Sequence, residues 1–269
     1  MKIHYLMACA MLATGLAGAA SAQDRPAPLQ PSESWNGFKN GLIAGESVAD
    51  GSDVLSIDAP YRANDAATVP ISFTQTGGAR IESAAVVIDE NPSPVAAEFD
   101  FAPGMGPLSF EMRVRVDQYS NVRVIADSAD GQVMVGRFVK ASGGCSAPAS
   151  RNPEEALDNM GEMRLRTFMD DAAINTPRRE AQIMIRHPNY SGLQRDQVTQ
   201  LFVMAHFIDT IEVMQGDEPL WSMEGGISIS ENPVFRFSYD DNGSTDLTVR
   251  ATDTEGNTFE AVLPKGATG

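Results

Sequence analysis

The feature that most constrains this fold is a repeated alternation of apolar and polar side chains with a period of two. In residues 110–117 every second position is apolar, and these positions hold Phe110, Met112, Val114 and Val116. The positions between them are charged, and they hold Glu111, Arg113, Arg115 and Asp117. Successive side chains of a strand point to opposite faces. The segment therefore predicts a strand with one buried face and one polar face.

Shorter runs of the same kind recur along the chain. They lie at residues 69–74, 180–186, 235–239 and 247–251. Turn sequences rich in Gly, Asp and Asn separate them, such as Asp240–Gly243. Short strands and turns at this spacing predict an all-β chain of β-sandwiches. Two short helices are expected near residues 34–42 and 153–160, where Ser34 and Asn152 are suitable N-terminal caps.

The order of these segments predicts a leader and two domains. Residues 1–22 combine Lys2, an apolar run and the cleavage pattern Ala20-Ser21-Ala22, which is typical of a secretory signal peptide. The domains are predicted as follows: a β-sandwich at 33–140, a flexible cysteine-bearing arm and linker at 141–162, and a second β-sandwich at 163–264. The halves also echo one another in Ile88–Pro92 and Ile229–Pro233.

The net charge and the predicted localisation restrict the class of partner. The formal net charge is −16, which disfavours binding to nucleic acid or to an anionic membrane surface. Beyond the signal segment, no apolar run approaches the roughly 20 residues that span a bilayer. We therefore expect a soluble protein that is exported to the periplasm.

Removal of the signal peptide would leave Cys145 as the single cysteine. An unpaired cysteine in an exported protein indicates a reactive thiol or an intermolecular bond. Gly143 and Gly144 precede it, and neighbouring side chains are small. Glycine gives the backbone wide conformational freedom. We therefore expect a flexible arm that presents an exposed thiol with a pKa near its reference value of about 8.5.

Several short motifs, taken in order, resemble the fused SoxYZ-like sulfur carriers described as associated with quinoprotein dehydrogenases. The SoxY-like motifs lie at 58–60, 69–70, 88–92 and 139–145. The SoxZ-like motifs lie at 185–188, 191–193, 229–233 and 253–256. In contrast to the family's Gly-Gly-Cys-Gly-Gly C-terminus, this chain continues after Cys145 through Ser146, Ala147 and Pro148.

The resemblance implies an immunoglobulin-like β-sandwich for each half. It also implies a carrier and not an enzyme. Sulfur intermediates would be held covalently on Cys145, with no catalytic residue, no metal and no other cofactor. The implied partners are periplasmic sulfur-oxidising enzymes, c-type cytochromes or a quinoprotein dehydrogenase. An intramolecular interface between the SoxY-like and SoxZ-like halves would replace the heterodimer of the family.

Other interpretations remain open at this stage. His187 and His206 are separated in sequence and are interpreted as structural, because no metal-ligand spacing joins them to the cysteine. The alternative to a carrier is a two-domain module that binds a periplasmic dehydrogenase or cytochrome, with an incidental thiol. A thiol redox enzyme is disfavoured because, with Cys9 in the predicted signal peptide, no second cysteine would remain to resolve a disulfide. Replacement of Cys145 by Ser separates the carrier from the module, since only the carrier needs the sulfur.

Overall fold

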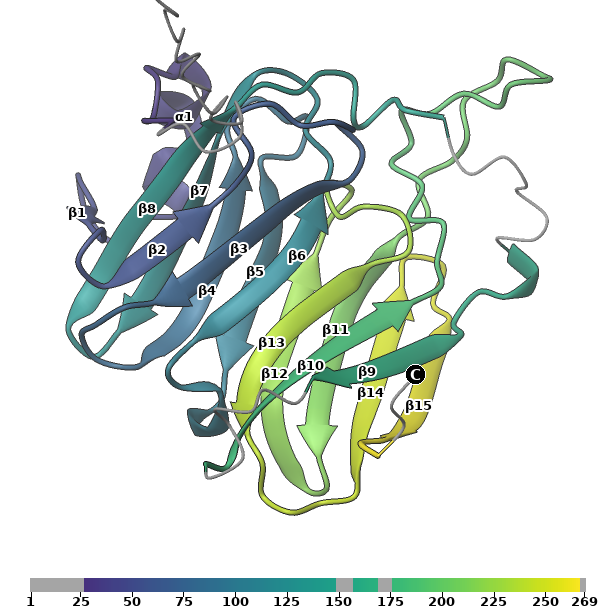
Figure 1. The fold of residues 1–269 in the computed structure, drawn as a ribbon. Coiled ribbons are helices and arrows are strands. Elements are labelled where there is room, and N and C mark those ends of the chain that lie inside the picture. Colours follow the sequence, from purple (N-terminus) through teal and green to yellow (C-terminus); the bar gives the residue numbers. More distant parts are fainter. Residues whose placement is uncertain (1–26, 149–156, 169–175, 267–269) are drawn as a thin grey trace, which may run out of the picture.

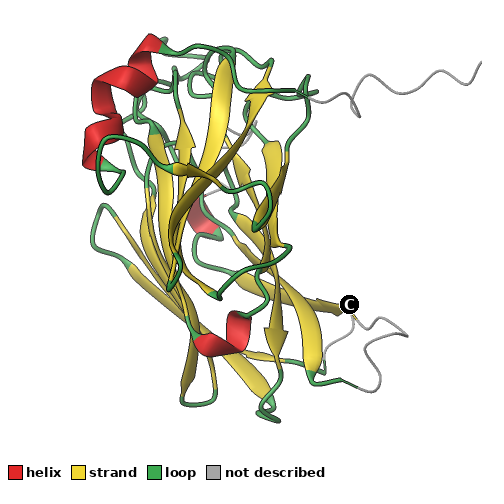
Figure 2. Cartoon of the chain, turned by 90° about the vertical axis from the view of Figure 1, so that its left-hand side faces the viewer, coloured by secondary structure: helices red, strands yellow, loops and turns green. Residues whose placement is uncertain are grey.

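Two layers of β-strands make up the computed structural model, which describes residues 27–148, 157–168 and 176–266. Figure 1 shows the layers from the front, and Figure 2 shows them after a quarter turn. The predicted signal peptide at 1–22 lies outside the described residues. Within those residues, no helix is both long and apolar enough to cross a membrane.

The secondary structure is almost entirely strand. The first half contains α1 (Glu33–Phe38), η2 (Lys39–Gly41), β1 (Ala49–Asp50), β2 (Leu55–Asp58), β3 (Val69–Gln75), β4 (Ile81–Ile88), β5 (Val95–Phe101), η3 (Pro103–Met105), β6 (Ser109–Val114), β7 (Ser120–Ser128) and β8 (Gly131–Val139). The second half contains β9 (Met163–Phe168), β10 (Arg178–Ile185), β11 (Ile208–Gln215), β12 (Glu218–Gly225), β13 (Val234–Asp240), β14 (Asp246–Asp253) and β15 (Thr258–Pro264).

Both sheets run from one half into the other. The nine-stranded sheet has the order β1-β8-β7-β4-β5-β12-β11-β14-β15, and the six-stranded sheet has the order β2-β3-β6-β13-β10-β9. At the junction β5 pairs with β12, with Phe99 opposite Met223. In the other layer β13 pairs with β6, with Phe235 opposite Met112. Backbone hydrogen bonds therefore join the halves in both layers (Figure 1).

One hydrophobic core fills the space between the layers and extends through both halves. At its centre Phe110 packs against Trp221 and Phe235, with ring centroids 5.3 and 6.2 Å apart. The ring centroids of Phe99 and Phe110 lie 4.9 Å apart. Burial of one such aromatic side chain contributes roughly 1.5–3 kcal/mol. The aromatic cluster therefore stabilises the junction as well as each half.

The all-β fold predicted from the sequence is confirmed, although the continuous sheets were not foreseen. The alternation in β6 holds as far as Val114, but Arg115 is buried. Its predicted place on the polar face is wrong, because β6 ends at Val114 and the chain turns inward beneath the arm. The helix expected near 34–42 is present as α1 and η2. The helix expected at 153–160 lies partly outside the described residues, within which Leu157 and Asp158 are helical.

Candidate functional site

The segment that carries Cys145 lies against the loop that follows β6. The amide of Gly143 donates to the Asp117 carbonyl over 2.7 Å, and the amide of Gly144 donates to the Val116 carbonyl over 3.0 Å. The Cys145 amide donates to Oδ1 of Asp117 over 3.2 Å. Three successive amides are thus held by one short loop.

The two glycines have structural roles beyond flexibility. Gly143 has a φ of +78°, a left-handed conformation that glycine adopts without strain. A Cβ on Gly144 would lie 2.1 Å from the Ala66 carbonyl oxygen and 2.7 Å from the Val116 amide nitrogen. Only a residue without a side chain fits there, so Gly144 allows close packing of the arm.

The second half covers the arm from the other side. The Ser191 hydroxyl donates to the Cys145 carbonyl. Nε2 of Gln194 donates to the Ala147 carbonyl over 2.9 Å. Both side chains belong to the connection between β10 and β11, residues 186–207, which is called the covering loop below. The arm therefore lies where the two halves meet.

Cys145 is fully buried in this arrangement, with 0% of its surface exposed. The expectation of an exposed, freely moving thiol is wrong for this conformation, because both halves hold the backbone on either side of the sulfur. Burial raises the pKa of the Cys145 thiol to about 12, and the Asp117 carboxylate adds to this shift. Arg115 acts in the opposite direction. In the enclosed state the protonated thiol is therefore favoured over the thiolate at neutral pH.

Arg115 lies beneath the arm and is 1% exposed. Its Nη1 donates to the Gly144 carbonyl over 3.2 Å, and its Nη2 donates to the Asn189 carbonyl over 3.3 Å. Nε of Arg115 is buried and has no hydrogen-bond partner in the part of the chain that the structure describes. One guanidinium thus contacts both the arm and the loop that covers it.

Two asparagines fix the loops on either side of Arg115. The Asn91 side chain donates to the Arg115 carbonyl over 2.7 Å and accepts from the Asp117 amide over 2.8 Å. Asn189 has a φ of 43°, and its side chain donates to the Ser230 carbonyl over 3.1 Å. These bonds orient the backbone groups that Arg115 and the arm contact.

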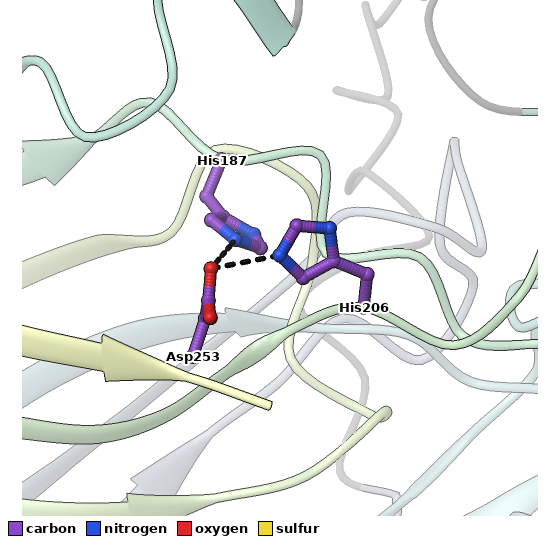
Figure 3. A group of neighbouring side chains, drawn as sticks. All are labelled: His187, His206 and Asp253. Atoms are coloured by element: carbon purple, nitrogen blue, oxygen red, sulfur yellow. Dashed lines mark hydrogen bonds and ion pairs between the residues drawn. The ribbon is translucent and has the colours of Figure 1, made fainter. Parts of the chain in front are cut away.

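A buried group of His187, His206 and Asp253 anchors the covering loop (Figure 3). Nε2 of His206 lies 2.7 Å from Oδ2 of Asp253, and Nε2 of His187 lies 3.4 Å from the same oxygen. Nδ1 of His187 accepts from the Asn189 amide over 3.0 Å, which leaves its proton on Nε2. The histidines thus act at both ends of the loop that contains Ser191 and Gln194.

The three side chains offer ligand atoms within 4.8 Å of one another, a grouping that sequence separation had hidden. Two imidazoles and a carboxylate are sufficient to bind a metal ion. Asp253 already accepts hydrogen bonds from its own turn, from the amides of Glu255 and Asn257 and from the Asn257 side chain. Burial raises the pKa of Asp253, but these bonds and that from His206 outweigh it and hold the pKa well below its usual range. The geometry is that of a hydrogen-bonded anchor.

An exposed apolar segment lies within the covering loop. Five of the eight exposed large hydrophobic side chains in the described residues lie between positions 193 and 204. They are Leu193, Val198, Leu201, Phe202 and Met204. The segment projects from the molecule beside the arm, at the upper right of Figure 1. Such a patch is typical of a protein interaction site.

Comparison with known proteins agrees with this division into halves. Residues 39–145 match the family model described as sulfur oxidation protein SoxY, and residues 170–264 match that described as sulphur oxidation protein SoxZ. The chain therefore belongs to the sulfur-oxidation carrier proteins. More particularly, it is a fused SoxYZ-like protein in which one chain supplies both domains and the interface between them.

One similar solved structure is that of the sulfur carrier protein SoxY from Chlorobium limicola f thiosulfatophilum. It is 22% identical, with a TM-score of 0.34, over 39% of this chain and 89% of that chain. A search of curated proteins found no significant match.

Sequence reasoning singled out Cys145, Gly143 and Gly144, and the structure places all three together at the junction. It missed Arg115, because the alternating pattern assigned that residue to a solvent face. It also missed the joint role of His187 and His206. The motifs around Ser191 and Asp253 contributed to the family resemblance. These motifs were the signal from which the importance of the covering loop could have been predicted.

Proposed function

We propose that this protein is a periplasmic carrier that holds sulfur intermediates covalently on Cys145 and presents them to partner enzymes. It has no chemistry of its own beyond attachment and release. The predicted signal peptide at residues 1–22 supports export of the protein. The observation that carries the proposal is the location of Cys145 at the end of the SoxY match, held by polar contacts between the two domains.

The contacts that enclose the arm can be released. Among the described residues, hydrogen bonds hold the arm backbone from both halves, mostly to neutral groups. A hydrogen bond of this kind contributes only about 0.5–1.5 kcal/mol because water replaces it on release. We infer that the enclosed arm is a resting state and that partner binding frees it.

The attachment of thiosulfate illustrates the chemistry. The released thiol loses a proton to water, its sulfur bonds to the terminal sulfur of thiosulfate, and an S-thiosulfonate forms. This step removes two electrons, which must pass to an acceptor on the partner. A c-type cytochrome would accept them one at a time, and a quinoprotein dehydrogenase is the other partner class that the resemblance suggests. The exposed apolar side chains of residues 193–204 supply a surface on which such a partner could dock beside the arm.

Intact-mass spectrometry of the protein purified from its native periplasm tests the proposal. We expect added mass on the Cys145 peptide, in units of sulfur or thiosulfonate, that reductant removes. The Cys145→Ser variant should carry none and should lose the carrier activity. A bare thiol in every growth condition, together with full function of Cys145→Ser, would instead support the two-domain interaction module.

A further inference from the structure

Arg115 has an unusual environment for a buried charge. The side chain is 1% exposed, yet it forms no ion pair within the described residues. Its two hydrogen bonds are long, at 3.2 and 3.3 Å, and both go to neutral carbonyls. Its Nε has no partner there. Buried cations are normally paired, because an uncompensated charge loses the solvation that water would provide.

The arm is the part of the molecule that could supply the missing anion. Arg115 donates to the carbonyl of Gly144, the residue directly before Cys145. The enclosed cysteine is itself neutral at physiological pH, so it leaves the guanidinium without a counter-ion. A sulfur species that ends in a sulfonate would bring a negative charge and several acceptor oxygens to this position.

We propose that Arg115 is a binding residue for anionic cargo carried on Cys145, so that a loaded arm is retained more tightly than an empty one. The inference rests on the proposed carrier function and adds the residue that would retain those adducts that end in a negatively charged group. Arg115 would exchange a bond to a neutral carbonyl for a charge-assisted bond to the adduct. The covering loop must shift to admit it, because Cys145 is fully enclosed in the empty state.

Carboxylates around the site do not replace this anion. Asp65 and Glu231 act on Arg115 through space, and Asp117 acts on Cys145. Asp65 is exposed, and Glu231 and Asp117 are only partly buried. Water screens such groups far more than it screens a buried pair. Asp117 opposes an anion on the cysteine, which makes the cation beneath it more important for retention.

Chemical loading of Cys145 tests the proposal. With tetrathionate, the thiolate attacks one of the two central sulfurs, thiosulfate leaves, and the product is the anionic S-thiosulfonate. With methyl methanethiosulfonate, methanesulfinate leaves and the product is a neutral methyl disulfide. Protein produced from residue 23 onward has Cys145 as its single cysteine, and mass spectrometry confirms one addition. The measurement is the rate at which dithiothreitol releases each adduct from wild type and from Arg115→Met.

The ratio of the variant rate to the wild-type rate, taken separately for each adduct, removes the difference in intrinsic reactivity. We expect Arg115→Met to release the thiosulfonate roughly tenfold to a hundredfold faster, the factor that corresponds to a charge-assisted hydrogen bond. The neutral adduct should change little. Arg115→Lys should retain part of the effect because it keeps the charge. The exposed Arg113, two residues earlier and on β6, provides the matched control Arg113→Met.

Equal ratios for the two adducts would overturn the proposal, because a purely structural arginine would affect both alike. Should Arg115→Met fail to fold, the wild type alone remains informative. Its thermal midpoint should be higher with the thiosulfonate than with the methyl disulfide, and equal midpoints would again overturn the proposal. Since cells play no part in this loading, a bare native thiol would count against the proposed function without deciding the role of Arg115.

Discussion

Two buried arginines in the first half have opposite surroundings. Arg123, on β7, is 4% exposed and binds Asp89 through two hydrogen bonds of 2.7 and 2.8 Å. Its guanidinium also lies 4.3 Å from the Trp35 ring centroid. Arg115 is as deeply buried, but its hydrogen bonds within the described residues go to two neutral carbonyls. The comparison teaches that this chain can build a complete arginine site, and that the incomplete one lies beside Cys145, the residue on which we propose that cargo is carried.

The largest expected effect comes from making Arg123 resemble Arg115. Asp89→Asn removes the carboxylate and leaves a buried cation without its partner. We expect the free energy of unfolding to fall by about 3–5 kcal/mol, as for other broken buried pairs. Arg115→Met removes no ion pair among the described residues. Its free energy of unfolding should fall by no more than about 2 kcal/mol, from the lost hydrogen bonds. Urea unfolding measures both, and equal losses would mean that Arg115 is a structural residue like Arg123.

Gly144→Ala changes the packing of the arm and leaves both arginines in place. The new Cβ would overlap the Ala66 carbonyl oxygen, 2.1 Å away. Since backbone lies on both sides, the arm must move away from Arg115. We expect overpacking to disfavour the enclosed state by about 1–3 kcal/mol. Labelling of Cys145 by a maleimide should accelerate roughly fivefold to a hundredfold. Gly41→Ala is the control, because a Cβ there meets nothing within 4 Å. Unchanged labelling would show that close packing at Gly144 does not limit access to the thiol.

A double-mutant cycle can give Arg115 the counter-ion that Arg123 already has. Cys145→Asp places a carboxylate where the anionic adduct would lie, and Cys145→Asn is its neutral counterpart. We expect the difference in unfolding free energy between these two variants to shift in favour of Asp by about 1–2 kcal/mol when Arg115 is present rather than Met. A coupling near zero would mean that the guanidinium does not reach an anion at position 145.

The contrast between the two arginines also explains what sequence can predict. Alternation placed Phe110, Met112 and Val114 in the core correctly, because a period of two is a local property of a strand. The same rule failed for Arg115, since the end of β6 depends on Ser228 and Asn91, which hold the backbone of that residue. Their contacts arise from chain segments far apart in sequence, and no local pattern encodes them.

The position of Cys145 shows the same limit. The small residues around it predicted a flexible arm with an exposed thiol, whereas the thiol is buried. Enclosure comes from Ser191 and Gln194, which lie more than forty residues further along the chain. The side chains near the cysteine in sequence are small and do not predict burial, whereas the cover consists of polar groups that contact the arm backbone. Hydrophobic periodicity does not report on such contacts.

A pH titration gives the smallest effect under ordinary conditions and tests the environment of the thiol directly. Burial raises the pKa of Cys145 to about 12 in the enclosed state. A raised pKa means that the unfolded chain loses the proton first. The stabilisation from the buried thiol is therefore complete well below the ordinary thiol pKa of about 8.5 and declines as the pH rises toward 12. The difference in unfolding free energy between wild type and Cys145→Ser should be constant from about pH 6 to about pH 7.5 and should then fall. This comparison cancels the titration of lysines and tyrosines, which both proteins share.

A constant difference up to pH 11 would mean that the thiolate is already tolerated in the enclosed state, and that Arg115 compensates it as fully as Asp89 compensates Arg123.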